Sequence, residues 1–201
     1  VALLAVAVAL GVGLWLRTGM TLLYIGLGGV LCTVLYPFLK YNALGDFVIF
    51  TAYALLPTIG TSYVCTFGID WNVLFIAVPV GLITVAILHC NNLRDIGTDS
   101  RAHISTIAMR LGEKTSVWLY CIEILFPYLW ISGCVIWGVL PVWTLLAWIS
   151  VIPAVRNAMT AYGFFKEGSA AISNLDEATA KLQLLFSLSV AAAFVVSGIL
   201  S

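Results

Sequence analysis

Long stretches without a charged residue limit most strongly what this chain can fold into. No Asp, Glu, Lys or Arg occurs in residues 1–16, 18–39, 47–67, 71–93, 124–155 and 182–201. Roughly 20 apolar residues in a helix cross the hydrocarbon core of a bilayer. The run over 124–155 has 32 residues, enough for two helices with a break near 138–141. We therefore predict an all-α polytopic transmembrane helical bundle with seven spans, centred near residues 8, 28, 56, 80, 127, 148 and 190.

The composition agrees with a lipid environment. Charged residues make up 9% of the 201-residue chain, whereas a soluble domain carries about 25%. Nine Lys and Arg balance nine Asp and Glu, so there is no basic excess of the kind that attracts nucleic acid. The five cysteines lie in or beside apolar stretches without a C-x-x-C pair, which favours packing over a disulfide or a metal site. The composition thus predicts an integral membrane protein, with lipid as its partner, and indicates no protein or nucleic-acid partner.

The basic residues are distributed unequally between the two sides of the predicted bundle. Of the nine, only Arg17 lies in a loop that is odd-numbered from the N-terminus. The even-numbered loops hold Lys40, Arg94, Arg101, Arg110, Lys114, Arg156, Lys166 and Lys181. Because cytoplasmic loops are enriched in Lys and Arg, we expect the even-numbered loops to face the cytoplasm.

One polar segment, residues 89–101, does not fit a plain helix end. It follows an apolar stretch directly, and Asn91, Asp95 and Asp99 occur at i, i+4 and i+8. If the helix continues, the three side chains share one face. Mg²⁺ prefers carboxylates, waters and substrate phosphates, and it would relieve the repulsion between the two aspartates. Arg94 and Arg101 are then candidates to bind the oxygens of a diphosphate.

A simpler interpretation of the same segment stays open. Helix ends are often rich in solvated Asp and Arg, and the spacing D-x-x-x-D alone is a weak signal. Gly97 also weakens a helix between the two aspartates, so the shared face depends on the local backbone.

Other ionisable residues lie in or near the predicted spans. Glu123 is about two turns from a cytoplasmic end, which favours a hydrogen-bonded residue facing the bundle over a catalyst. Asp46 stands at an expected helix start, where capping is the leading explanation. His89 is interpreted as a bundle histidine with satisfied hydrogen bonds. The glycine-rich segment 26–29 is predicted to form a close-packing face.

The segment from Asn91 to Gly112 resembles the second aspartate-rich motif of the UbiA superfamily of intramembrane prenyltransferases. Residues 36–40 (Y-P-F-L-K), followed by L-G-D at 44–46, are similar to a cytoplasmic loop of that family, and residues 180–186 resemble the start of its last helix. The likeness covers nearly the whole chain. It departs from the family pattern at His103-Ile104, where Gly-Lys is usual.

The resemblance implies a single prenyltransferase domain over 1–201, with the second aspartate-rich motif in a cytoplasmic loop at 90–115. The family has nine helices and a first motif, N-x-x-x-D-x-x-x-D, that does not occur here. The chain also begins with Val and has no charged segment before its first span. We therefore expect seven of nine helices, the first two being absent, and a polypeptide that is inactive alone.

The implied reaction transfers a polyprenyl group from an isoprenyl diphosphate to an aromatic acid, with Mg²⁺ as cofactor. Asp95 and Asp99 are the expected metal ligands and catalytic residues. Lys40, Asn91, Arg94 and Arg101 are expected to bind the diphosphate. Each has an alternative: Lys40 would also suit a membrane-surface anchor, and Asn91 would suit capping or packing at the helix end. The two arginines could equally pair with Asp95, Asp99 or lipid headgroups. The N-N-x-R-D form is most similar to family members that use 1,4-dihydroxy-2-naphthoate and yield demethylmenaquinone, pyrophosphate and CO2. This implies a bacterial cytoplasmic membrane, with the site facing the cytoplasm.

Two alternatives remain. The chain could belong to another branch of the same family, with 4-hydroxybenzoate, haem or a chlorophyll precursor as acceptor. A polytopic transporter subunit that uses Asp95 and Asp99 for ion coupling is the less favoured alternative. Transporters carry ionisable groups near mid-membrane, whereas the charges of this chain cluster on one side of the predicted bundle.

Overall fold

Helices account for almost all of the chain, as the apolar stretches predict. The computed structural model describes residues 2–102 and 105–200, and within these ranges it contains no strand. The first part comprises α1 (Ala2–Thr18), α2 (Met20–Tyr41), α3 (Gly45–Phe50), the π-helical segment η1 (Thr51–Leu55) and α4 (Leu56–Thr66). The second comprises η2 (Trp71–Val73), α5 (Leu74–Arg94), α6 (Ile96–Arg101), α7 (Ile107–Leu111), α8 (Glu113–Ile136), η3 (Val142–Ser150), α9 (Val151–Glu167), η4 (Gly168–Ile172) and α10 (Leu175–Leu200).

Six segments are long and apolar enough to cross a membrane. They are Met20–Lys40, Gly45–Thr66, Trp71–Arg94, Glu113–Ile136, Val142–Ile172 and Leu175–Leu200. Each coincides with a predicted span, and the break expected near 138–141 separates α8 from η3. The remaining predicted span corresponds to α1, whose 17 residues make it shorter than the others. The chain is therefore an all-α integral membrane protein.

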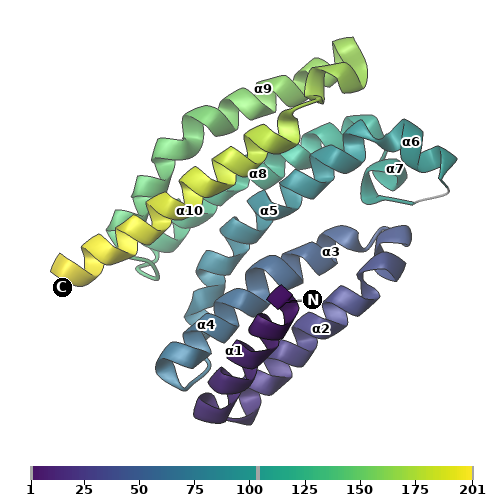
Figure 1. The fold of residues 1–201 in the computed structure, drawn as a ribbon. Helices are drawn as coiled ribbons and strands as arrows, with labels where there is room; N and C mark the ends of the chain where they lie inside the picture. The colour runs from purple at the N-terminus through teal and green to yellow at the C-terminus, as the bar shows by residue number, and fades with distance from the viewer. Residues whose placement is uncertain (1, 103–104, 201) are drawn as a thin grey trace.

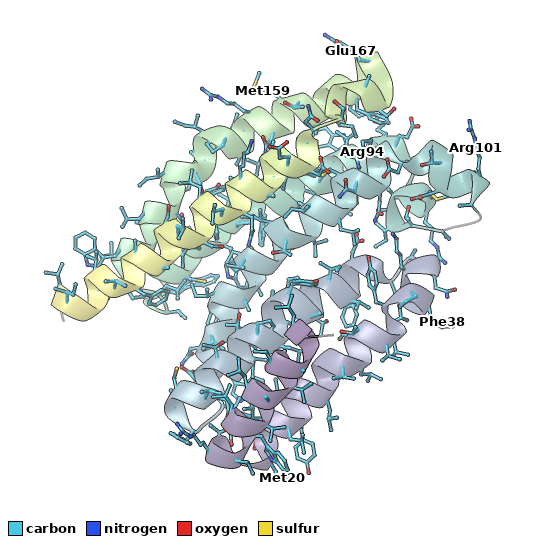
Figure 2. The ribbon with its side chains drawn as sticks, in the orientation of Figure 1. Met20, Phe38, Arg94, Arg101, Met159 and Glu167 are labelled. Carbon is cyan, nitrogen blue, oxygen red and sulfur yellow. The ribbon has the colours of Figure 1, made fainter. Side chains whose placement is uncertain are left out.

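Helix α5 joins two groups of helices (Figure 1). On one side α8 and α10 pack directly against α5, and α9 packs against α8 and α10. On the other side α3 and η1 pack against α5, while α1, α2 and α4 pack against one another. Among the residues labelled in Figure 2, the charged Arg94, Arg101 and Glu167 lie toward one end of the bundle, and Met20 lies at the opposite end. Which end faces the cytoplasm stays a prediction.

The core lies among α5, α8, α9 and α10, where polar side chains hydrogen-bond between elements. The Tyr120 hydroxyl on α8 lies 2.7 Å from the Thr179 hydroxyl on α10, and both are buried. The Tyr128 hydroxyl lies 2.8 Å from the Ser150 hydroxyl of η3. Such bonds satisfy polar groups that hydrocarbon cannot solvate, and they fix the helices relative to one another.

Among the described glycines, Gly81 of α5 has the least room for a side chain. A Cβ at this position would lie 2.5 Å from Cε2 of Phe50 and 2.8 Å from the Cβ of Ala54. The prediction of a close-packing face at residues 26–29 is wrong. A Cβ at Gly28 would make an ordinary 3.6 Å contact with Leu56, and one at Gly26 or Gly29 would meet nothing within 4 Å.

We expect Gly81→Ala to lower the thermal unfolding midpoint in detergent, because the added methyl group forces α5 away from α3 and η1. Overpacking of this kind costs about 1–3 kcal/mol. Gly29→Ala is the matched control, since it adds the same group to open space within a helix. Equal midpoints for the two variants would contradict the close approach.

Candidate functional site

The polar segment singled out in the sequence begins in the last turn of α5 and continues in α6. The helix is interrupted at Asp95, whose backbone angles are φ −96° and ψ 9°. Hydrogen bonds nevertheless cross the interruption: the Asp95 amide donates to the Asn91 carbonyl at 2.9 Å, and the Asp99 amide donates to the Asp95 carbonyl at 2.9 Å. Asn91, Asp95 and Asp99 therefore stay one helical turn apart despite the break.

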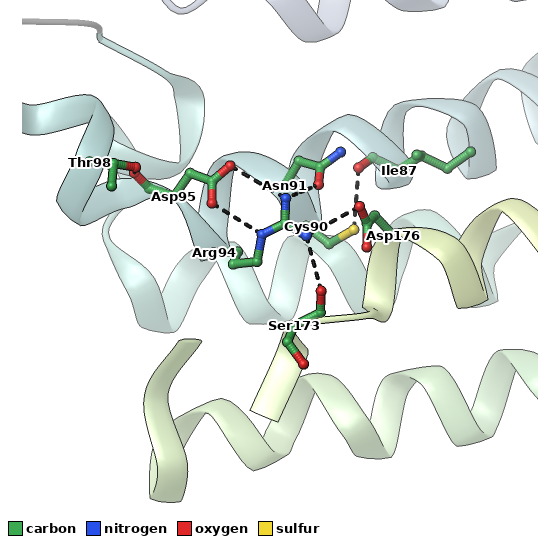
Figure 3. A network of polar contacts seen from close by, with 8 residues as sticks. All are labelled: Ile87, Cys90, Asn91, Arg94, Asp95, Thr98, Ser173 and Asp176. Atoms are coloured by element: carbon green, nitrogen blue, oxygen red, sulfur yellow. Dashed lines mark hydrogen bonds and ion pairs between the residues drawn. The ribbon is translucent and has the colours of Figure 1, made fainter. Parts of the chain in front are cut away.

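Arg94 is the centre of a polar network at this end of the bundle (Figure 3). Its Nε donates to Asp95 Oδ1 at 3.1 Å, and one terminal nitrogen donates to Asn91 Oδ1 at 2.7 Å and to Asp95 Oδ2 at 3.4 Å. The other terminal nitrogen donates to the Ser173 carbonyl at 3.2 Å and lies 3.2 Å from Asp176 Oδ2. A guanidinium has five N–H donors, and these contacts can engage all of them. To contact a diphosphate, Arg94 would have to give up at least one of these contacts within the protein.

Asp176 and Ser173 were not identified from the sequence. Ser173 precedes α10, and Asp176 lies in its first turn, where a negative charge is favoured by the helix dipole. The two residues lie about eighty positions after Arg94, so no local spacing relates them to it. Their contacts join the end of α5 to the start of α10.

The other predicted site residues lie outside this network. Lys40 is in the last turn of α2, and the chain then folds back so that Gly45 lies near both Lys40 and Leu88 of α5. Asp99 and Arg101 belong to α6. Within the described part of the chain, no ion pair was found for Lys40, Asp99 or Arg101. The segment at 90–115 contains α6 and α7, and the departure at His103-Ile104 lies outside the described residues.

An apolar groove leads to the polar end. It runs between α3–η1 and α5 and is lined by Ile49, Tyr53, Thr84, Ile87, Leu88 and Asn91. A second groove, between α2 and α3–η1, shares Ile49 and Tyr53 with the first. The two grooves together provide apolar surface that ends beside Asn91.

A separate group of ionisable side chains is buried deeper in the bundle. Asp46 of α3, His89 of α5 and Glu123 of α8 are 8%, 0% and 4% exposed. His89 Nδ1 lies 3.4 Å from Asp46 Oδ2 and 3.6 Å from Glu123 Oε1. Glu123 faces the bundle, as predicted, but the expected hydrogen bonding is incomplete, because its Oε2 has no partner among the described residues.

Two interpretations of this group are wrong. Asp46 does not cap α3, whose N-cap is Leu44 without a side-chain hydrogen bond. His89 is not fully satisfied either, because its Nε2 makes no well-formed hydrogen bond to any described residue, although the Ser116 backbone interacts with the ring. The sequence did contain a signal for the group, namely three ionisable residues within or beside apolar spans. Their proximity, however, depends on the packing of three helices.

These features define an integral membrane helical bundle with an aspartate-containing polar end, at which Asn91 also lines an apolar groove. Residues 1–175 match the UbiA prenyltransferase family. The chain belongs to this family.

Relatives occur in animals and in bacteria. The chain is 35% identical over 127 residues to the UbiA prenyltransferase domain-containing protein 1 homolog of Drosophila melanogaster, covering 61% of this chain and 35% of that protein. It is 33% identical over 153 residues to the rat UbiA prenyltransferase domain-containing protein 1, covering 74% of this chain and 42% of the relative. It is 38% identical over 80 residues to the 1,4-dihydroxy-2-naphthoate octaprenyltransferase of Mycobacterium leprae, covering 40% of this chain and 27% of that protein. The chain thus spans less than half the length of these relatives.

We expect Arg94→Ala to destabilise the protein more than Asp176→Asn. Loss of the guanidinium leaves several acceptors without a donor, which costs about 1–3 kcal/mol. The side chains of Arg94 and Asp176 are 27% and 30% exposed, and the amide of the Asn variant still accepts a hydrogen bond, so its effect should stay below about 1 kcal/mol. Unfolding midpoints in detergent would measure the loss of stability of each variant. A larger loss for Asp176→Asn than for Arg94→Ala would contradict the central position of Arg94 in the network.

Proposed function

We propose that the protein carrying these residues transfers a prenyl group from an isoprenyl diphosphate to an aromatic acceptor. The observation that carries the proposal is the one-turn spacing of Asn91, Asp95 and Asp99 at the end of an apolar groove. An isoprenyl diphosphate has a charged head and a long apolar tail. The polar end suits the head, and the groove suits the tail, which gains about 0.8 kcal/mol for each CH₂ group removed from water. Family membership supports the same chemistry and argues against the transporter alternative.

The residues at this end fit Mg²⁺. Asp95 and Asp99 offer hard oxygen ligands one turn apart, and Asp99 has no ion pair within the described chain. Each Asp95 oxygen has one contact with Arg94 and keeps further acceptor capacity. Mg²⁺ is usually bound by one or two carboxylates together with waters and substrate phosphates. When bound, it would neutralise the charge that develops on the departing diphosphate.

The basic residues have separate proposed tasks. Lys40 and Arg101, which have no ion pair among the described residues, would bind the outer oxygens of the diphosphate. Arg94 would hold the Asp95 carboxylate and the Asn91 amide in position, and could reach the diphosphate by exchanging one hydrogen bond. Apolar walls would limit access of water to the reacting carbon, which protects an allylic cation from hydrolysis.

1,4-Dihydroxy-2-naphthoate is the proposed acceptor, and the products are then demethylmenaquinol (the reduced form of demethylmenaquinone), pyrophosphate and CO2. The N-N-L-R-D form at 91–95 and the similarity to octaprenyltransferases that are named for this acid support the choice. A different acceptor is the second candidate. The Drosophila and rat relatives match longer parts of this chain, and their names specify no acceptor.

We propose that the even-numbered loops face the cytoplasm, because they carry eight of the nine basic residues. The diphosphate site would then open toward the cytoplasmic side. Since relatives come from both bacteria and animals, the similarity does not select a bacterial membrane.

Asp95→Asn and Asp99→Asn in the full-length protein should each reduce prenyl transfer at least about 100-fold, because each removes a charged oxygen ligand. Release of pyrophosphate from a radiolabelled isoprenyl diphosphate in proteoliposomes would measure the rate. Glu177→Gln is the matched control, since Glu177 is an exposed carboxylate on α10 paired with Lys181. Wild-type rates in both aspartate variants would remove these residues from the proposed site.

The acceptor is tested by supplying the same preparation with 1,4-dihydroxy-2-naphthoate or 4-hydroxybenzoate. We expect prenylated product and CO2 from the naphthoate alone. Product from 4-hydroxybenzoate alone would support the second candidate and leave the transfer chemistry in place.

A further inference from the structure

The buried group formed by Asp46, His89 and Glu123 is not used in the proposed transfer. His89 precedes Asp95 by six residues, which corresponds to about 9 Å along α5. The three side chains come from α3, α5 and α8, and both α3 and α8 pack against α5 (Figure 1). The group therefore lies inside the bundle, away from the network around Arg94.

The distances within the group are too long for strong hydrogen bonds. Hydrogen bonds between a protonated histidine and a carboxylate are about 2.7–2.9 Å long. His89 Nδ1 lies 3.4 Å from Asp46 Oδ2 and 3.6 Å from Glu123 Oε1. By contrast, the exposed pair between Lys181 and Glu177 is 2.7 Å long.

The same distances match the spacing of ligands around a small cation. Bonds of about 2.0–2.2 Å from Zn²⁺ to nitrogen and oxygen place tetrahedral ligands about 3.3–3.6 Å apart. The ligand atoms of Asp46, His89 and Glu123 all lie within 4.8 Å of one another. One ion can therefore contact all three after small side-chain adjustments.

Charge and hydrogen bonding also favour a cation. If both carboxylates are ionised and the imidazole is neutral, as metal ligation requires, the group carries two negative charges in a buried place, which is costly without compensation. Within the described chain, no Lys or Arg pairs with Asp46 or Glu123. Glu123 Oε2 and His89 Nε2 are buried and make no well-formed hydrogen bond to any described residue, although the Ser116 backbone interacts with the His89 ring. The protein's own groups thus leave this cluster incomplete.

We propose that Asp46, His89 and Glu123 bind a divalent first-row transition metal, with Zn²⁺ as the representative ion. The ligand atoms are Asp46 Oδ2, His89 Nδ1 and Glu123 Oε1, and a water completes the coordination. Imidazole selects this class of metal over Mg²⁺, which prefers oxygen ligands alone. The ion joins α3 and α8 through α5 and stabilises the bundle. The proposal does not depend on the proposed prenyl transfer.

The first test uses the wild-type full-length protein without a histidine tag, purified in detergent and stripped with a chelator. One equivalent of Co²⁺ should produce the visible absorption bands of nitrogen and oxygen ligation, without the charge-transfer band of a cysteine thiolate. Zn²⁺ should displace Co²⁺ and raise the unfolding midpoint, whereas an excess of Mg²⁺ should not displace it.

The second test compares variants by Zn²⁺ competition against Co²⁺. Glu123→Gln and Asp46→Asn should each weaken Zn²⁺ binding by more than about 100-fold, since even outer-shell partners of a metal ligand contribute 10–100-fold. The control is the double variant Asp95→Asn with Asp99→Asn, which should bind Zn²⁺ as the wild type does. Size-exclusion chromatography would identify a variant that does not fold.

Two results would overturn the proposal. One is a stripped wild-type protein that binds no Co²⁺ and gains no stability from Zn²⁺, as expected if a protonated His89 is shared by the two carboxylates. The other is loss of the ion in the Asp95 and Asp99 variant with retention in Glu123→Gln. The wild-type spectrum decides the question even if a variant does not fold. Failure of prenyl transfer alone would count against the proposed function and not against this site.

Discussion

Hydrocarbon cannot form hydrogen bonds, and this constraint governs where the polar groups of the bundle lie. Backbone groups are satisfied within helices, which explains why the described chain contains no strand. Polar side chains lie either at one end, as Arg94 and Asp176 do, or in pairs between elements, as Tyr120 and Thr179 do. The buried group around His89 departs from this rule, because two of its polar atoms have no partner among the described residues; one buried atom each of Asn157 and Gln183 does the same.

Helix α5 connects these features. It carries His89 and, in the next turns, Asn91 and Arg94. Elements from both halves of the bundle pack against it, and Arg94 also holds the start of α10. A shift of α5 relative to α3 would therefore move the buried group and the aspartate-containing end together. The close contact at Gly81 helps to set this position, since α5 can approach η1 only where it lacks a side chain.

Local patterns predicted the helices and the spacing of Asn91, Asp95 and Asp99 well, because both depend on residues that are near one another in the chain. Predictions that depended on packing between helices were less successful. Glycines at 26–29 were expected at a close contact that occurs instead at Gly81. Asp46 was expected to cap a helix, yet its carboxylate faces a histidine 43 residues later. Neither outcome follows from periodicity, because periodicity indicates which face of a helix is buried but not which other helix packs against that face.

By itself, the sequence determined that the chain is a helical membrane protein, where its spans lie, and which helix end carries the aspartates. Hydropathy and helical spacing are properties of short segments, so no tertiary information was needed. Only the tertiary structure decided that Arg94 is held by the start of α10 and that Asp46, His89 and Glu123 meet in the interior. These contacts join residues tens of positions apart, and their geometry depends on how closely α3, α5, α8 and α10 pack.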